Sequence, residues 1–64
     1  MTDQVNEFFL KRAKLAEDIA EQHARDGEQD KALELLKQAY AFYTKAGSEP
    51  DVKRVKARYQ ELKG

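Results

Sequence analysis

The chain has 64 residues, and its 12 basic and 12 acidic side chains cancel to a formal net charge of zero. A chain this short buries only about 60% of the surface that its unfolded form exposes, which excludes a large catalytic architecture. The charge balance gives no overall attraction to nucleic acid. The lack of cysteine excludes disulfides and thiolate metal sites, and no apolar run approaches the roughly 20 residues of a membrane span.

Residues 3–25 are predicted to form the first helix. Their apolar positions recur every three or four residues, which is the spacing that lines one face of an α-helix. These positions are Val5, Phe8, Phe9, Ala13, Leu15, Ala16, Ile19, Ala20 and Ala24. Thr2 or Asp3 can cap the first turn, and Gly27 can adopt the left-handed conformation that ends the last turn.

Residues 29–46 are predicted to form the second helix. At 100° per residue, the apolar side chains spread from Leu35 and Phe42 at one edge to Tyr40 and Leu33 at the other, across about half of the helix surface. An apolar arc this wide predicts two neighbouring helices rather than one.

Residues 50–63 are predicted to form the third helix. Gly47 ends the second helix, Ser48 is placed to cap the next one, and Asp51 is placed to reach back in a capping box, with Pro50 in the first turn. The apolar residues then lie three and four apart, as expected of a narrow packing strip. They are Val52, Val55, Tyr59 and Leu62.

Together these signals predict one all-α domain over residues 1–64, a three-helix bundle with up-down-up topology. No alternation of apolar and polar residues reaches the length of a strand, so we expect no sheet. Residues 17–30 are rich in acid and residues 50–64 are rich in base, and the topology brings these segments side by side. We expect their charges to complement each other and to fix how the third helix packs.

Two polar residues fall on the apolar face of the first helix. We expect His23 to pack near the hairpin turn, and Arg12 to form a buried ion pair or to lay its stem on apolar surface, with an exposed binding anchor as the alternative. No glycine-rich phosphate loop or nucleophile motif is present, and a lone histidine lacks the partners of a metal site. We therefore predict no enzymatic activity, no cofactor and no metal.

Residues 23–39 read HARDGEQDKALELLKQA and resemble the centre of a tetratricopeptide repeat. In that repeat a glycine ends the first helix, and an Ala-Leu pair followed by another alanine opens the second; Ile19 and Ala20 match the Leu-Gly pair of its first helix. The third helix would cap this hairpin. The whole arrangement also resembles, more loosely, the microtubule-interacting and trafficking (MIT) domain. Both resemblances imply peptide or protein binding without catalysis.

The tetratricopeptide resemblance implies that Lys14, Glu17, Glu21 and Arg25 form the ligand-facing side of the first helix. Separately, the aromatic residues Phe9 and Phe42 are candidates for a contact surface, because neither lies at the centre of an apolar face. We expect a cytoplasmic interaction module that binds a helical or extended peptide in a groove between helices. The alternatives are a self-associating homodimer or an engineered helical scaffold without a natural ligand. We expect no membrane or nucleic-acid partner, although Arg54 and Arg58 leave phosphate binding as a weaker hypothesis.

Overall fold

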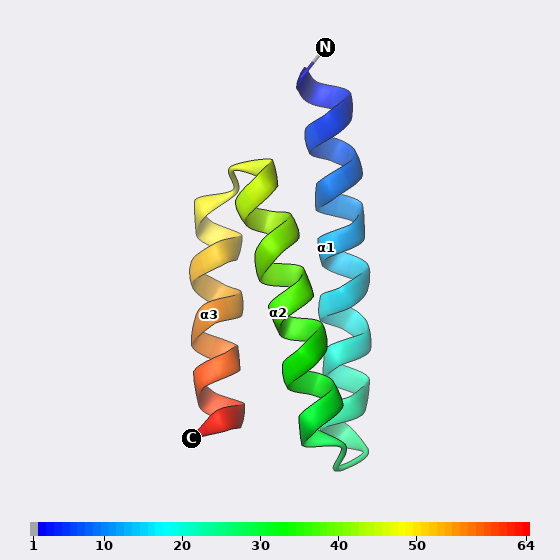
Figure 1. Ribbon diagram of the computed structural model, residues 1–64, viewed down its shortest axis with the longest axis vertical. Helices are drawn as coiled ribbons and strands as arrows, with labels where there is room; N and C mark the ends of the chain where they lie inside the picture. Colours follow the sequence, from blue (N-terminus) through cyan, green and yellow to red (C-terminus); the bar gives the residue numbers. More distant parts are fainter. Residues whose placement is uncertain (1) are drawn as a thin grey trace.

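The computed structural model describes the backbone of residues 2–64 and the side chains of residues 6–64. It has three helices and no strand in that part of the chain: α1 (Thr2–Arg25), α2 (Gln29–Ala46) and α3 (Glu49–Lys63). Successive helices run in opposite directions (Figure 1), so the predicted all-α, up-down-up architecture is confirmed. Each predicted helix agrees with the observed bounds to within one residue.

Two glycines make the turns between the helices. Gly27 and Gly47 have φ angles of +79° and +73°, the left-handed conformation that costs glycine no Cβ clash. The backbone N–H after each glycine donates back to the preceding helix, from Glu28 to the His23 carbonyl at 2.8 Å and from Ser48 to the Tyr43 carbonyl at 3.1 Å. The prediction that glycines end α1 and α2 is therefore confirmed.

The start of α3 differs in detail from the expected capping box. Ser48 is the residue before the helix and Pro50 lies in its first turn, as predicted. The Ser48 hydroxyl, however, donates to the Asp51 carboxylate at 2.5 Å and makes no bond to a backbone amide. The side chains of Thr2 and Asp3, predicted to cap α1, lie outside the described residues.

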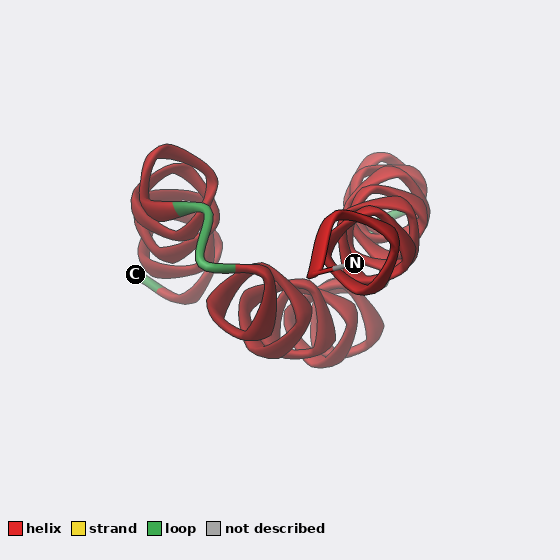
Figure 2. Cartoon of the chain, turned by 90° about the horizontal axis from the view of Figure 1, so that it is seen from above, coloured by secondary structure: helices red, strands yellow, loops and turns green. Residues whose placement is uncertain are grey.

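The helix α2 is the centre of the fold. Both α1 and α3 pack against it, whereas the backbones of α1 and α3 scarcely approach each other. Seen from above, α1 and α3 stand on the same side of α2 (Figure 2). The shallow depression between them, here called the trough, is lined by side chains of all three helices, among them Glu17, Tyr43 and Arg54. The wide apolar arc of α2 is explained by this arrangement, because one part of the arc faces α1 and the other part faces α3.

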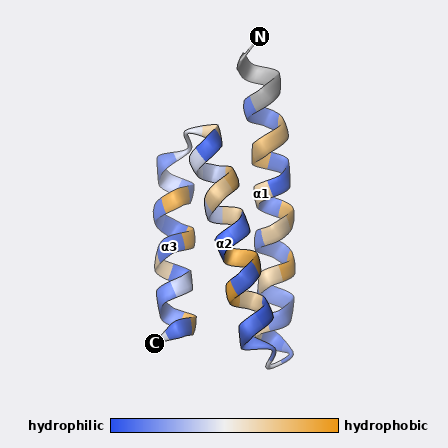
Figure 3. Ribbon diagram, in the orientation of Figure 1, coloured by the Kyte–Doolittle hydropathy of each residue, from blue (hydrophilic) through white to orange (hydrophobic). Residues whose placement is uncertain are grey.

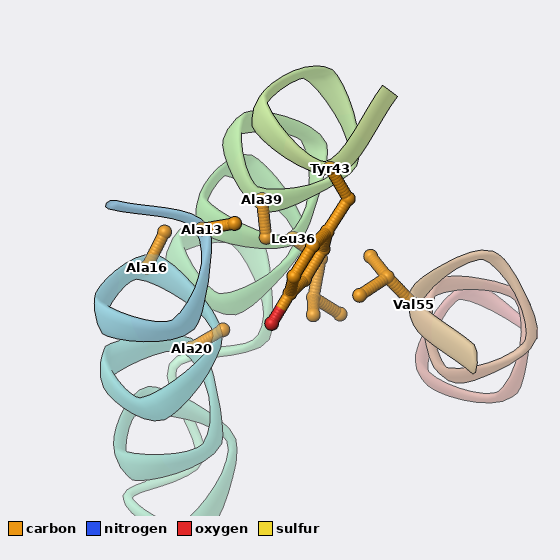
Figure 4. Close-up of a cluster of buried hydrophobic side chains, with 7 residues drawn as sticks. All are labelled: Ala13, Ala16, Ala20, Leu36, Ala39, Tyr43 and Val55. Carbon is orange, nitrogen blue, oxygen red and sulfur yellow. The ribbon is translucent and has the colours of Figure 1, made fainter. Parts of the chain in front are cut away.

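The core contains small residues between α1 and α2 and larger ones between α2 and α3. Its buried members are Ala13, Ala16, Ala20, Leu36, Ala39, Tyr43 and Val55. The alanines of α1 point at α2, and Val55 reaches from α3 toward Leu36 and Tyr43 (Figure 4). Small side chains allow α1 and α2 to approach closely. Hydrophilic positions predominate on α3 (Figure 3), so this helix has little apolar surface to hold it in place.

Candidate functional site

A network of polar side chains joins all three helices across the trough between α1 and α3. Arg54 of α3 donates to both carboxylate oxygens of Glu17 of α1, from Nε and Nη2, each at 2.9 Å. The hydroxyl of Tyr43 of α2 donates to the same carboxylate at 2.8 Å. Arg54 also donates to Asp51 at 2.5 Å, and its guanidinium lies 5.7 Å from the centre of the Tyr43 ring.

A second bidentate pair lies about one helical turn further along. Arg58 donates to the two carboxylate oxygens of Glu21 at 2.8 and 2.9 Å. The spacing repeats because Glu17 and Glu21, like Arg54 and Arg58, are four residues apart on parallel helices. The prediction that acidic α1 and basic α3 complement each other is thus confirmed for these two pairs. At the far end, Gln29 donates to the Leu62 carbonyl and ties the start of α2 to the end of α3.

The pKa values of these groups are shifted by their hydrogen-bond partners and by burial. The hydrogen bonds from Arg54 lower the pKa of Glu17, and those from Arg58 lower the pKa of Glu21. The Ser48 hydroxyl and then Arg54 lower the pKa of Asp51. Burial, reinforced by the Glu17 carboxylate, raises the pKa of Tyr43 to about 12. All four groups keep at neutral pH the charge states that the network requires.

The ligand-facing residues implied by the tetratricopeptide resemblance lie partly on this trough. Lys14, Glu17 and Glu21 line it together with Tyr43 and Arg54. The two glutamates are already occupied by arginines of the same chain, and Lys14 lies 3.8 Å from Asp18. Arg25, also among the implied residues, lies exposed at the end of α1 and does not line the trough. A ligand in the trough would have to displace formed ion pairs, so this surface acts mainly as a structural link.

An apolar groove lies between α2 and α3. We call it the α2–α3 groove; its volume is about 360 Å³ and it is open to solvent. Its lining residues are Leu36, Lys37, Tyr40, Val55, Lys56, Tyr59 and Gln60. Leu36 and Val55 are fully buried and form the floor, while Tyr40 is 41% exposed although it is a large aromatic residue. The groove therefore combines a rigid apolar floor with accessible aromatic walls.

The rim of the α2–α3 groove is basic. Lys37 and Lys63 place their ammonium groups 6.0 and 5.9 Å from the centre of the Tyr59 ring. Lys56 forms no ion pair with any described carboxylate, and Lys37 has only a loose contact of 3.9 Å with Glu34. Lys56 can thus receive an acidic group from outside the chain, and Lys37 can do so by exchanging its loose contact with Glu34.

A second apolar surface spans the outer side of α1 and α2. We call it the α1–α2 face; its members are Phe8, Arg12, Leu15, Ala16, Ile19, Leu35, Gln38 and Phe42. Phe8 and Leu15 are 53% and 54% exposed. Phe9 and Phe42, the predicted contact pair, stack with ring centres 6.1 Å apart and are half-buried, so they mainly join α1 to α2.

His23 and Arg12, the two polar residues predicted on the apolar face of α1, lie in different surroundings. His23 lies half-buried at the hairpin turn as predicted, where its Nδ1 and the Glu28 carboxylate are 2.8 Å apart. Arg12 is exposed, so among the alternatives for it the buried ion pair is wrong and the exposed position is the one observed. Its guanidinium lies 5.4 Å from the centre of the Phe8 ring, a cation–π arrangement, and it contacts no described carboxylate.

The sequence reasoning did not identify the α2–α3 groove. Its signal was present, because Tyr40 follows Leu36 by four residues and Tyr59 follows Val55 by four residues, which places each tyrosine beside a core position. The sequence places Tyr40 at an edge of the apolar arc and Tyr59 in the packing strip of the third helix, without bringing the two together. Which edge of a wide apolar arc stays uncovered depends on where α3 packs, and that position is fixed by long-range ion pairs.

Other kinds of site are not formed by the described residues. No group of three His, Asp or Glu side chains among them converges as metal ligands would. None of their helices is both long and apolar enough for a membrane crossing. Comparison with protein-family models, curated proteins and solved structures gives no match for this chain. The tetratricopeptide and MIT resemblances accordingly stay predictions.

Proposed function

We propose that this chain is a non-catalytic interaction module that binds an amphipathic helical peptide with acidic flanks in the α2–α3 groove. The observation that supports it is an apolar groove that is open to solvent, lined by two tyrosines and bordered by lysines. A groove between two helices accepts a third helix through side chains at positions i, i+3, i+4 and i+7. Basic rims favour a peptide with carboxylates beside those positions.

Two features of the groove favour binding over a purely structural role. Tyr40 and Tyr59 offer large aromatic surface that loses little conformational entropy on binding, and aromatic side chains dominate the energetics of protein interfaces. Leu36 and Val55 are held by the core, so the floor is formed before any ligand arrives. The trough between α1 and α3 offers neither feature, because its polar groups are paired within the chain.

The test is a selection of peptides from a displayed random library, followed by titration of enriched peptides into isotope-labelled protein. We expect enriched sequences with apolar residues three and four apart and with Asp or Glu beside them. Their saturable amide shifts should map to Lys37, Tyr40, Lys56 and Tyr59. Replacing Tyr40 by Asp should abolish binding, since it places a charge in the apolar wall.

The matched control is Leu15→Asp, which puts the same charge on a similarly exposed apolar position of the α1–α2 face. Its peptide affinity should equal that of the wild type. The proposal is wrong if the selection enriches no peptide, if enriched peptides lack acidic residues, or if the shifts map to α1 rather than to α2 and α3.

A further inference from the structure

We propose that α3 opens from the hairpin of α1 and α2 as a unit while the hairpin stays folded, and that ionic strength controls how often it opens. The α2–α3 groove has one of its walls on α3, so each opening removes the site where the peptide would bind. This consequence for binding rests on the proposed function, whereas the opening itself does not.

The contacts between α1 and α2 do not depend on α3. The buried alanines of α1 point at α2 (Figure 4), and the Phe9 ring of α1 stacks on the Phe42 ring of α2. At the turn, the Glu28 N–H donates to the His23 carbonyl and the two side chains are also in contact, both at 2.8 Å. These contacts hold the hairpin at both of its ends, so it keeps them when α3 leaves.

The apolar contacts of α3 are few by comparison. Val55 is fully buried, whereas Val52, Tyr59 and Leu62 are only half-buried. The rest of the helix is mainly hydrophilic (Figure 3). A helix of 15 residues is marginal in water without a neighbour to pack on. We therefore expect α3 to lose its helical hydrogen bonds when it leaves α2, which exposes its backbone amides to exchange with solvent.

The attachment of α3 to α1 is charged and accessible to solvent. Arg54 binds both carboxylate oxygens of Glu17, and the backbones of the two helices scarcely approach each other. Arg58 binds Glu21 in the same way, and the two arginine side chains are 52% and 37% exposed. In 1 M salt the screening length falls to about 3 Å, which weakens pairs of exposed charges but not the burial of apolar side chains. Salt therefore weakens the attachment of α3 without weakening the packing of α1 on α2.

The turn between α2 and α3 permits this opening. Only Gly47 and Ser48 join the two helices. The bonds that end α2 run from their N–H groups to the Thr44 and Tyr43 carbonyls, and the Ser48 hydroxyl donates to Asp51 at the start of α3. All of these bonds are local, so α2 keeps its end whether or not α3 lies against it.

The test is amide hydrogen exchange of the full chain, followed by NMR at low salt and in about 1 M sodium chloride. The exchange rate divided by the intrinsic rate of an unfolded amide gives the opening constant. We expect the amides of α3 to share one opening constant, about tenfold or more above that of the core amides of α1 and α2. Salt should raise the constant of α3 about fivefold.

Three variants separate the attachment of α3 from the packing of the hairpin. Arg54→Gln combined with Arg58→Gln should raise the opening constant of α3 about fivefold or more at low salt and remove most of the effect of salt. Lys11→Gln combined with Arg12→Gln removes the same charge from exposed positions of α1 and should change that constant less than about twofold. Phe9→Leu should raise the opening constant of the hairpin core and leave that of α3 unchanged, because the hairpin is intact whether α3 is open or closed.

Equal opening constants for α3 and the hairpin core would overturn the proposal, because the chain would then unfold in one step. So would an equal effect of salt in the wild type and in the double arginine variant, or a change in α3 caused by Phe9→Leu. If α3 of the double arginine variant loses all protection while the hairpin stays protected, the proposal is supported.

A peptide enriched in the library selection tests the proposed function separately. Binding in the groove should slow exchange in α3, because the peptide contacts only the closed state. Separate opening of α3 that no peptide slows would contradict the proposed function and would leave the opening itself established.

Discussion

The ion pair between Glu17 and Arg54 is expected to stabilise the fold measurably although it is close to the surface. The Glu17 side chain is only 18% exposed, and its carboxylate accepts two hydrogen bonds from Arg54 and one from Tyr43. Hydrogen bonds to charged groups contribute about 1.5 to 3 kcal/mol when well shielded. Arg54 is 52% exposed, so screening by solvent reduces the expected coupling to about 1.5 kcal/mol.

A double-mutant cycle measures this coupling free energy. Glu17→Ala, Arg54→Ala and the double variant are unfolded with urea, and the coupling is the part of the destabilisation that is not additive. Arg54 keeps Asp51 as a partner when Glu17 is removed, and Glu17 keeps the Tyr43 hydroxyl as a donor when Arg54 is removed, so neither single change leaves its partner without any hydrogen bond. The same cycle on Lys14 and Asp18, an exposed pair within α1 at 3.8 Å, should give about 0.3 kcal/mol.

Equal coupling in the two cycles would refute the reasoning. It would mean that the bidentate geometry and the Tyr43 hydroxyl add nothing to an ordinary surface pair. A second readout keeps the result specific: loss of the Glu17 pair should increase hydrogen exchange in α3 more than in α2, because α3 is held by fewer apolar contacts.

Four further outcomes follow from the same contacts. Leu36→Ala should lower the free energy of unfolding by about 2 to 4 kcal/mol, because the Leu36 side chain of α2 is fully buried. Leu15→Ala at micromolar concentration should lower it by less than about 0.5 kcal/mol, because Leu15 is more than half exposed. Gly47→Ala should lower the free energy of unfolding by about 1 to 2 kcal/mol. The cost comes from backbone strain at φ +73° alone, since an added Cβ meets no atom within 4 Å. Thermal unfolding of the Leu36, Leu15 and Gly47 variants measures these changes. The lowered pKa of Glu17 adds stability that is present above its ordinary value of 4.5 and is lost as the pH falls below it, so the melting temperature should drop on acidification and drop less in Glu17→Gln. At the alkaline end, the raised pKa of Tyr43 predicts that stability falls as the pH rises from 10 toward 12, which tyrosinate absorbance can follow.

The sequence predicts the helices well because their signals are local. Gly27 and Gly47 end helices through their own backbone conformation, and Pro50 starts α3 in the first turn, so no distant contact is needed to identify these positions. Even the charge complementarity of α1 and α3 could be predicted, because it follows from up-down-up topology and from two charged segments.

The identity of the open surfaces could not be predicted from these signals. Tyr40 and Tyr59 have the same helical spacing as buried core residues, and only the lateral position of α3 determines that they border a groove. For Phe9 and Phe42 the sequence favours the opposite interpretation. Each lies away from the centre of the apolar face of its helix, which indicates a contact surface, but their stacked rings also make them part of the packing between α1 and α2. Arg12 has no partner that the sequence can identify, so a buried ion pair, a stem on apolar surface and an exposed position all stay open until the structure places it exposed against Phe8.

The position of α3 links the structural network to the proposed binding groove. Val55 is the fully buried large side chain of α3, and the bidentate pairs of Arg54 and Arg58 supply the connection to α1 that the helix backbones lack. These arginines therefore fix how far α3 stands from α2, and that spacing sets the width of the α2–α3 groove. The polar residues of the trough and the apolar residues of the groove lie on different sides of α3, so the first set can shape the second without contacting a ligand. Weakening the pairs should lower peptide affinity more than it lowers the helix content of α1 and α2.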